Sequence, residues 1–493
     1  MTKATSPHLI RTSNPRHLVT NFLRLAAASA FWLTVAVTSG VHAADDLKPD
    51  SIEYKIAVQR ATQAAIWGMP AAGIVDIMLA TKRDLGGDVG DVVYFSKPME
   101  ARHGFLTANN NVPYVIASLS TKDSPIVVAV PPAEQKTSYF GTFVNAWDTP
   151  IADVGPPGDD KGKGGKYLFL PPGYEGEVPD GYLVFRPDTY SVNFAFRPVS
   201  QNGGTLEEAV GYAKRLKVYP LSAADNPPET TFIDAYPKKY NTLPVYDLTF
   251  FTDINTVIQN EPVLERDKAM MGILAGIGIE KGKPFNPGPV MTKALQEGIE
   301  TAYAQMQAYF TTPGKALVPY WNERKWQSLD LPKEQAAEGF PFVTDDKVLI
   351  DERAGGAYFW ATYLPKVLGK GSFYLMGLDD AEGNSLDGKS TYRLGVSKDV
   401  PAKDFWSVIA YSMKTKGFIE NGDPVGLGSL DKKSMKVNED GTVDIYFAPK
   451  PPKGFESNWI PTGEDFMLIF RLYGPEDSLF SKSWVLNDVE KVK

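Results

Sequence analysis

The sequence predicts a mainly β fold with a helical connector, an α+β arrangement in which two antiparallel β-sandwich or jelly-roll-like domains are joined by helices. Two groups of short β-like runs, separated by turns, have the spacing that is typical of sandwiches and barrels. Between them lies a segment whose apolar residues recur at helical spacing. We therefore expect a signal peptide at 1–43, an N-terminal β-rich domain at 44–235, a helical connector at 236–339 and a C-terminal jelly-roll-like domain at 340–493.

The first 43 residues have the pattern of a signal peptide. Arg11, Arg16 and Arg24 precede an apolar run from Leu25 to Val37, and the small residue Ala43 suits signal peptidase. The run is shorter than the ~20 residues that a membrane-spanning helix needs, so an anchor is the weaker interpretation. We expect cleavage after Ala43 and export to the periplasm or medium by the general secretory route, with no membrane span left in the mature protein.

The composition excludes some classes of function. The chain has no cysteine, so neither disulfide bonds nor thiolate chemistry is available to it. Its formal net charge is -8, and removal of a basic signal peptide would make the remainder more acidic. We therefore expect no nucleic-acid partner, because proteins that bind nucleic acids usually present basic surfaces.

Histidine limits the kinds of metal and catalytic site. The chain has four histidines, and only His103 lies outside the predicted signal peptide. A zinc site built from two or three histidines is therefore excluded, and we expect no metal and no cofactor. A Ser-His-Asp triad would have to use His103, whose alternative interpretation is a histidine in an ordinary loop.

The N-terminal domain is predicted to begin with helices. Asp50-Ser51-Ile52-Glu53 resembles a capped helix start, and alanines at helical spacing follow it. We expect Pro70 to interrupt this helix, with a second helical segment from Ala71 to Lys82. The strands expected after it are Tyr114–Ser118, Ile126–Val130, Tyr139–Asn145, Tyr167–Leu170, Tyr182–Phe185 and Ser191–Arg197.

Helices and then strands are predicted for the rest of the chain. Thr205 and Glu208 form a capping box that opens a short helix to Leu216. A longer helix after Pro287 has an apolar stripe, which is Met291, Leu295, Ile299, Ala302 and Met306. Asp440-Gly441 indicates a hairpin. The strands expected in the C-terminal domain are Ser372–Met376, Tyr392–Val396, Phe405–Tyr411, Ser434–Val437, Thr442–Phe447 and Phe466–Tyr473.

The last of these strands is almost entirely apolar or aromatic. A run of this kind, bounded by glycines, predicts a strand that is buried on both faces at the centre of a sheet. Arg471 is its one charged residue. Because an unpaired buried charge costs several kcal/mol, we expect Arg471 to be paired with a carboxylate or with several backbone carbonyls.

Several motifs in order resemble a bacterial two-domain family. In the C-terminal half they are Asp387-Gly388, Tyr392-Arg393-Leu394, Asp404-Phe405-Trp406-Ser407, Asp440-Gly441-Thr442, Asn458-Trp459-Ile460-Pro461 and Arg471-Leu472-Tyr473-Gly474-Pro475. This half is similar to domain of unknown function twelve fourteen. The N-terminal half resembles domain of unknown function twelve fifty-four through Trp67-Gly68, Asn109-Asn110-Asn111-Val112-Pro113-Tyr114 and Asn145-Ala146-Trp147-Asp148. The resemblance implies two β-rich domains joined by helices, and no established reaction.

Two groups of residues are candidates for a functional site. Asp148 follows a predicted strand beside Trp147, and an acid next to an aromatic ring suits sugar binding or general acid–base catalysis, in which His103 is a second candidate. The expected substrate-binding residues are Asn111, Tyr114, Trp147, Asn458, Trp459 and Arg471. We expect them to converge in an interdomain cleft. The alternative is that Trp147 and Trp459 are core residues and that Asp148 caps a turn.

Three classes of function stay open. The first is an exported soluble protein that binds a glycan or another small molecule in an interdomain cleft. The second is a carboxylate-dependent hydrolase acting on carbohydrate or a similar polar substrate, which requires two acidic groups about 5 to 10 Å apart. The third is a structural or host-contact protein, which predicts a large flat apolar patch.

Overall fold

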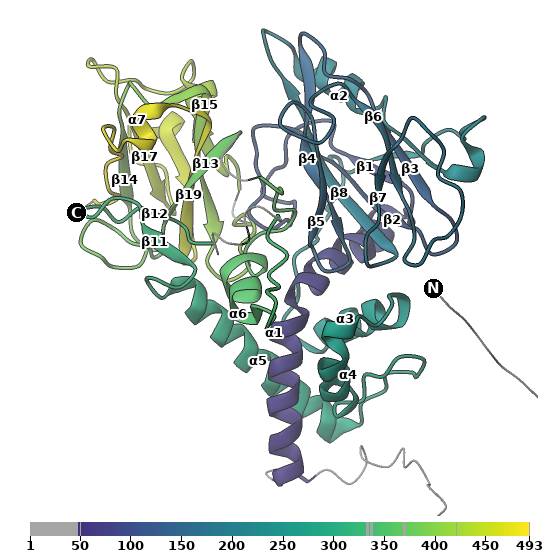
Figure 1. Ribbon diagram of the computed structural model, residues 1–493. Coiled ribbons are helices and arrows are strands. Elements are labelled where there is room, and N and C mark those ends of the chain that lie inside the picture. The colour runs from purple at the N-terminus through teal and green to yellow at the C-terminus, as the bar shows by residue number, and fades with distance from the viewer. Residues whose placement is uncertain are drawn as a thin grey trace, which may run out of the picture. The chain divides into compact units, whose positions relative to one another are not determined.

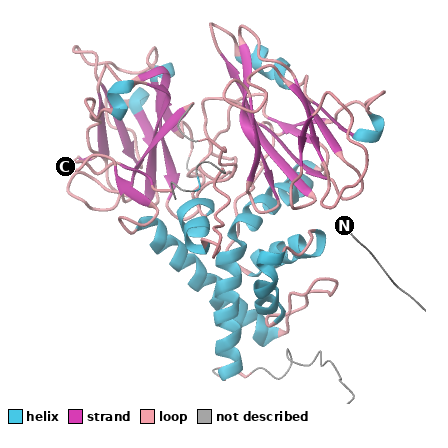
Figure 2. Cartoon of the chain, viewed as in Figure 1, coloured by secondary structure: helices cyan, strands magenta, loops and turns pink. Residues whose placement is uncertain are grey.

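The computed structural model describes residues 48–49, 51–331, 335, 339–367, 371–420 and 422–492. The predicted signal peptide at 1–43 lies outside the described residues. Residues from Ala44 to Lys493 form one compact unit. Within it, Figure 2 shows the strands in two groups and the long helices outside them. The predicted fold class is confirmed, since the structure is mainly β with helical parts.

The first helix, α1, runs without a break from Ile52 to Ala80 and continues as a π-helical turn from Thr81 to Leu85. Ser51 caps it, because its hydroxyl oxygen accepts a hydrogen bond from the backbone of Tyr54 at 3.1 Å. The predicted interruption at Pro70 is wrong. Residues 64–77 are buried at every position, and this packing holds the helix together where proline removes a hydrogen bond. Figure 1 shows α1 changing direction along its length, as proline-containing helices do.

The helix from Ile52 to Leu85 is also long and apolar enough to cross a membrane. Most of the apolar window, 89 %, is buried inside the protein. Core helices of globular proteins that are apolar on all sides share this property, so its composition alone does not indicate a membrane span.

The N-terminal strands form two stacked sheets. A six-stranded sheet has the order β10-β1-β2-β8-β4-β5, and a four-stranded sheet has the order β7-β6-β3-β9. Their shared core is rich in phenylalanine and tyrosine. The bounds are β1 Val92–Tyr94, β2 Val115–Ser120, β3 Ile126–Val130, β4 Thr137–Asn145, β5 Pro150–Val154, β6 Gly165–Phe169, β7 Leu183–Phe185, β8 Ser191–Ser200, β9 Lys217–Pro220 and β10 Phe232–Asp234.

The helical part lies mainly between the two groups of strands in the sequence. The capping box at Thr205 is confirmed, and its helix α2 spans Leu206–Ala213. All five residues of the predicted apolar stripe are buried in α5, which packs along α1. The helices are α3 Leu248–Asn260, α4 Lys268–Ala275, α5 Pro289–Thr311 and α6 Ile350–Arg353, with a π-helical turn at Ala354–Tyr358 and a last helix, α7, at Asp477–Phe480.

The C-terminal strands form a second pair of sheets. One has the order β11-β12-β13-β19-β15-β16 and the other β18-β17-β14-β20. Most neighbouring strands are antiparallel, although β1 with β10, β6 with β7, and β17 with β18 are parallel pairs. The bounds are β11 Leu317–Pro319, β12 Gln327–Leu329, β13 Ser372–Gly377, β14 Tyr392–Val396, β15 Ala402–Ser412, β16 Gly426–Gly428, β17 Val443–Ala448, β18 Trp459–Pro461, β19 Phe466–Pro475 and β20 Glu490–Lys491.

The predicted hairpin at Asp440-Gly441 is half right. The turn forms, with the backbone of Gly441 donating to Asn438 at 2.9 Å, and β17 follows it. The segment Ser434–Val437 is not a strand. Its backbone at Lys436 instead exchanges two hydrogen bonds with the side-chain amide of Asn458, at 2.7 and 2.9 Å. A side chain therefore satisfies backbone groups that a neighbouring strand was expected to pair.

Strand β19 is central in its sheet and buried on both faces, as predicted. Alternate residues of a strand point to opposite faces. Leu468, Phe470 and Leu472 enter the core between the two C-terminal sheets. Met467 and Ile469 join the other large core, which includes α1 and α5. Arg471 therefore shares the face of Met467 and Ile469, outside the C-terminal sandwich.

Candidate functional site

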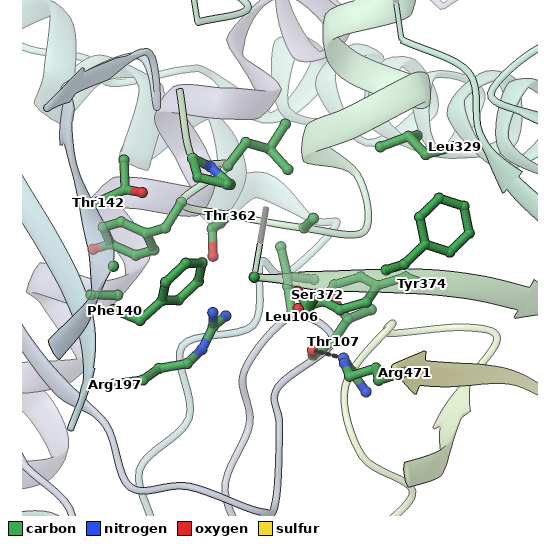
Figure 3. Close-up of a pocket in the computed structure, with 18 of the residues that line it drawn as sticks. Leu106, Thr107, Phe140, Thr142, Arg197, Leu329, Thr362, Ser372, Tyr374 and Arg471 are labelled. Atoms are coloured by element: carbon green, nitrogen blue, oxygen red, sulfur yellow. Dashed lines mark hydrogen bonds between the residues drawn. The ribbon is translucent and has the colours of Figure 1, made fainter. Parts of the chain in front are cut away.

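A cavity of about 460 Å³ is lined by residues from both six-stranded sheets and from the loops beside them. Figure 3 shows some of the lining side chains. One wall comes from residues 105–107, β4 and β8, and another from residues 360–367, β13 and Arg471. Most of the lining is apolar or aromatic. The volume falls within the range of about 300–1,000 Å³ that is usual for small-molecule sites.

Arg197 of β8 supplies the positive charge of the first wall. Residues directly opposite each other on neighbouring strands share a sheet face, and Arg197 is paired with Phe140 of β4. Its guanidinium carbon lies 5.8 Å from the centre of the Phe140 ring and 5.3 Å from that of Tyr114. The Nε atom donates to the Tyr114 hydroxyl at 3.2 Å. The two terminal nitrogens have no protein acceptor among the described residues and remain available to a ligand.

Arg471 of β19 supplies the positive charge of the second wall. It is 2 % exposed, so its predicted burial is confirmed. Its Nη1 atom donates to the hydroxyl of Tyr411 at 2.6 Å, and its Nη2 atom donates to the backbone carbonyl of Thr107 at 2.7 Å. The predicted pairing is thus only partly right, because one carbonyl and a tyrosine take the place of a carboxylate. Nε has no acceptor among the described residues.

Tyrosine hydroxyls surround the two arginines. Tyr374 of β13 lies directly opposite Arg471, whose guanidinium carbon is 4.9 Å from the centre of its ring. The side chain of Asn109 donates to Tyr473, and its backbone donates to the Tyr114 hydroxyl at 3.1 Å. Among the described residues, no carboxylate forms an ion pair with either arginine. Two guanidinium groups therefore lie in a largely apolar cavity without a protein counter-ion.

The arginines change the acidity of one tyrosine in particular. Burial alone would raise the pKa of Tyr374, but the positive charges of Arg197 and then Arg471 lower that pKa to about 8. Tyr411 behaves differently, since burial outweighs the influence of Arg471 and raises its pKa. Burial, with the nearby Tyr374 as the next contribution, also raises the pKa of Tyr473.

The structure brings together only part of the predicted site. Tyr114 and Arg471 line the cavity. Asn111 lies next to this wall, where its backbone donates to the Asn109 side chain at 2.8 Å, but it is not a lining residue. Of the residues expected to converge, Tyr114 and Arg471 are the two that the structure places in the lining of this cavity.

Trp147 and Asp148 lie in the protein core. The ring centre of Trp147 is 4.4 Å from that of Trp67 in α1. Asp148 is fully buried, and one carboxylate oxygen accepts a hydrogen bond from the backbone of Tyr363 at 3.0 Å. Burial raises the pKa of Asp148 well above its ordinary value. These surroundings match the alternative interpretation, in which both residues are structural.

His103 is also enclosed by protein. Its Nδ1 atom accepts a hydrogen bond from the backbone of Glu100 at 2.9 Å, and Nε2 lies 3.2 Å from the carbonyl of Tyr236. These partners require the proton on Nε2. Burial lowers the pKa of His103, which favours the neutral ring. No hydrogen bond within the described part of the chain links it to Asp148, so the two candidates for acid–base catalysis do not form a unit.

Asn458 and Trp459 lie away from the cavity, at the edge of the smaller C-terminal sheet. Asn458 is fully buried, and besides Lys436 its side chain donates to the backbone of Asp444 at 2.9 Å. The indole nitrogen of Trp459 donates to the carbonyl of Ala448 at 2.8 Å. Both residues hold loops and strands together, and neither lines the cavity.

Arg197 and Tyr374 are two polar residues of the cavity that were not predicted from the sequence as site residues. The signal for Arg197 was present, because it is the one charged residue of an aromatic-rich strand, as Arg471 is of its own strand. Tyr374 has no such signal. Its importance depends on two arginines that are distant in sequence. In the described part of the chain, no group of three or more histidine, aspartate or glutamate side chains is placed to hold a metal ion.

Comparisons with known proteins found similar solved structures. No protein with a curated description matches the chain. A protein from Vibrio parahaemolyticus, VPA0106, has a similar solved structure, with 20 % identity and a TM-score of 0.52 over 89 % of this chain and 100 % of the other. This likeness shows the fold alone. An uncharacterised protein from Burkholderia cenocepacia gives 11 % identity and a TM-score of 0.38 over 90 % of this chain and 96 % of its own.

Two family models match separate parts of the chain. The family described as "Protein of unknown function (DUF1254)" matches residues 89–220, and "Protein of unknown function (DUF1214)" matches residues 371–477. The cavity takes residues from both regions, such as Arg197 from the first and Arg471 from the second. Residues 89–220 of the chain are therefore similar to the DUF1254 family, and residues 371–477 to the DUF1214 family.

Proposed function

We propose that the protein binds a small molecule in this cavity, and that the ligand carries a negative charge beside an apolar or aromatic body. The proposal rests on the observation that Arg197 and Arg471 both line this cavity, and neither has a carboxylate partner among the described residues. An anion would supply the missing charge to groups that are costly to leave unpaired. The aromatic and aliphatic lining would contact the rest of the ligand.

The same chemistry limits the glycan that was considered from the sequence. A neutral sugar would leave both guanidinium groups without a counter-ion, so a glycan ligand would need an acidic group. None of the lining residues is aspartate or glutamate, so the cavity does not support the hydrolase alternative with its two carboxylates. That alternative, the host-contact role and export to the periplasm or medium stay predictions.

Thermal-shift measurements with paired probes test the proposal. Phenylacetate should raise the melting temperature, whereas the neutral phenylacetamide should not, because only the carboxylate can pair with Arg197. The variant Arg197→Gln should bind phenylacetate about 10- to 100-fold more weakly, the usual effect of losing a charged hydrogen bond. Arg393→Gln is the matched control, since Arg393 lies on β14 and pairs with Glu490 outside the cavity.

Equal shifts with the acid and the amide would contradict the preference for an anion. Unchanged phenylacetate binding in Arg197→Gln would place the ligand elsewhere. To test the cavity itself, Ala195→Trp fills space at the wall that Ala195 lines, and it should abolish the shift. Circular dichroism of each variant confirms that it is folded.

A further inference from the structure

Tyr374 occupies a distinct position among the tyrosines of the cavity. The register of β13 and β19 places it directly opposite Arg471 on the face that lines the cavity. The guanidinium carbon of Arg471 is 4.9 Å from its ring centre. The side chain is only partly buried, so a ligand in the cavity can reach it. Figure 3 shows Tyr374, Arg471 and Arg197 around the same space.

The charged and titratable groups around Tyr374 come from three other strands and from the segment before β2. Arg197 belongs to β8, Arg471 and Tyr473 to β19, and Tyr411 to β15, while Tyr114 immediately precedes β2. The two arginines are positive, and burial raises the pKa values of Tyr411 and Tyr473. Among the described residues, no acidic side chain lines the cavity to offset the two charges. The surroundings therefore make the phenolate of Tyr374 easier to form than that of an ordinary tyrosine.

The other tyrosines lack this combination of exposure and charge. The Tyr411 hydroxyl donates to the backbone carbonyl of Ala108, which requires its proton, and the residue is fully buried. Tyr114 accepts hydrogen bonds from Asn109 and Arg197. Only for Tyr374 do the two arginines outweigh burial and lower the pKa, to about 8. Roughly half of Tyr374 is thus the phenolate at about pH 8, and roughly a tenth at about pH 7.

We infer that Tyr374 is the proton-exchanging residue of this cavity, which takes a proton from a weakly acidic ligand such as a phenol, an enol or a carbon acid beside a carbonyl. The inference rests on the proposed function for the binding of that ligand. In the step, the O–H or C–H bond of the ligand breaks and the O–H bond of Tyr374 forms. The electron pair stays on the ligand, whose anion Arg197 and Arg471 stabilise. No oxidant or further reactant is needed.

An ultraviolet absorbance titration of the full chain tests the phenolate without any ligand. One tyrosine should ionise near pH 8, well before the ordinary tyrosines at about pH 10. The early step should be absent from Tyr374→Phe. It should persist in Tyr320→Phe, because Tyr320 also lines the cavity but its pKa is raised by burial. In Arg197→Gln it should move upward by about one pH unit, since one of the two positive charges is gone.

Calorimetry adds a signature of proton exchange that a structural role would not produce. Phenylacetate brings a second negative charge to the arginines, so its binding near pH 8 should be accompanied by proton uptake at Tyr374. The uptake is measured by repeating the titration in two buffers of different ionisation enthalpy. It should vanish in Tyr374→Phe while phenylacetate still binds.

The two proposals fail in different ways. The assignment of Tyr374 is overturned if the wild type shows no early ionisation step, or if the step is unchanged in Tyr374→Phe. This holds even if phenylacetate binds through Arg197. An early step that belongs to Tyr374 in a protein that does not bind phenylacetate supports the phenolate and contradicts the proposed anion site. Binding without proton uptake near pH 8 overturns the exchange.

Discussion

The Nη2 atom of Arg471 donates to the backbone carbonyl of Thr107 at 2.7 Å, which ties the central strand of the C-terminal sheet to the segment before β2. Two more hydrogen bonds join this sheet to the same segment. The Tyr411 hydroxyl of β15 donates to the carbonyl of Ala108, and the side chain of Asn109 donates to Tyr473 of β19. This segment is therefore a shared wall of the cavity. Its position depends on residues more than three hundred positions away.

Arg471→Lys should destabilise the protein by about 2–3 kcal/mol, because a lysine cannot make both hydrogen bonds of the guanidinium and leaves a buried group unpaired. Urea unfolding measures the change. Arg393→Lys is the control, since Arg393 is a partly exposed residue of β14, and it should alter stability by no more than about 0.5 kcal/mol. Equal stabilities of the two variants would show that the tie to Thr107 contributes nothing.

Asp253→Asn should make stability less dependent on pH. Asp76 of α1 and Asp253 of α3 are both buried, and burial raises the pKa of each carboxyl group. The negative charge of Asp253 raises the pKa of Asp76 further. The folded pair thus keeps protons that the unfolded chain releases above about pH 4, so stability should fall as pH rises from there through the folded pKa values.

The test compares urea midpoints at about pH 5 and about pH 8, where the fall should be smaller in Asp253→Asn than in the wild type. Asp225→Asn changes an exposed carboxylate and serves as the control. An identical fall in Asp253→Asn and the wild type would mean that the pair does not titrate as described.

Lys416→Met should stabilise the protein more at about pH 7 than at about pH 10. Lys416 is 1 % exposed, donates to the side chain of Gln307 at 2.6 Å, and lies 4.4 Å from the ring centre of Phe359. Burial lowers its pKa to about 7, whereas an unfolded lysine stays charged up to about pH 10. The contribution of Lys416 to the free energy of unfolding is therefore fully present above about pH 10, and it is lost as the pH falls from there through about 7.

Chemical unfolding at the two pH values gives the result for Lys416→Met. Lys414→Met removes an exposed lysine two residues away and should have no pH-dependent effect. If both variants behave alike, the buried ammonium group is not the source of the dependence.

Gly298→Ala and Gly272→Ala should have opposite effects. A Cβ atom on Gly298 would lie 2.4 Å from the Cβ of Ala61, so α5 and α1 would have to separate at a cost of about 1–3 kcal/mol. A Cβ on Gly272 in α4 meets nothing within 4 Å, so alanine there should stabilise by about 0.5–1 kcal/mol through helix propensity. Thermal unfolding of both variants measures the difference. A neutral Gly298→Ala would indicate that the helices adapt.

Much of the fold follows from local patterns in the sequence. All six strands predicted for the N-terminal half, and five of the six predicted for the C-terminal half, are close to those found, apart from small differences at the ends. The apolar stripe of α5 is confirmed. The errors at Pro70 and at Ser434–Val437 have one cause. Tertiary contacts, the packing of α1 and the side chain of Asn458, overrode the local preference.

The site was less predictable than the fold. Arg471 stood out because it interrupts an apolar strand, and such a charge needs a partner. Trp147 and Asp148 were chosen by residue type, which does not reveal whether a side chain faces a core or a cavity. The effect of Arg197 on Tyr374 arises between β8 and β13, whose juxtaposition no local pattern encodes.

The alternation of β19 also constrains how the chain can fold. A shift of its pairing by one residue would move Arg471 from the cavity into the apolar interior of the C-terminal sandwich, and would bring Leu472 or Phe470 to the cavity in its place. Such a misaligned sheet would contain a guanidinium with neither Tyr411 nor Thr107 in reach. The arginine that gives the cavity its charge therefore also discriminates against the nearest wrong alignment of the strand through which it enters.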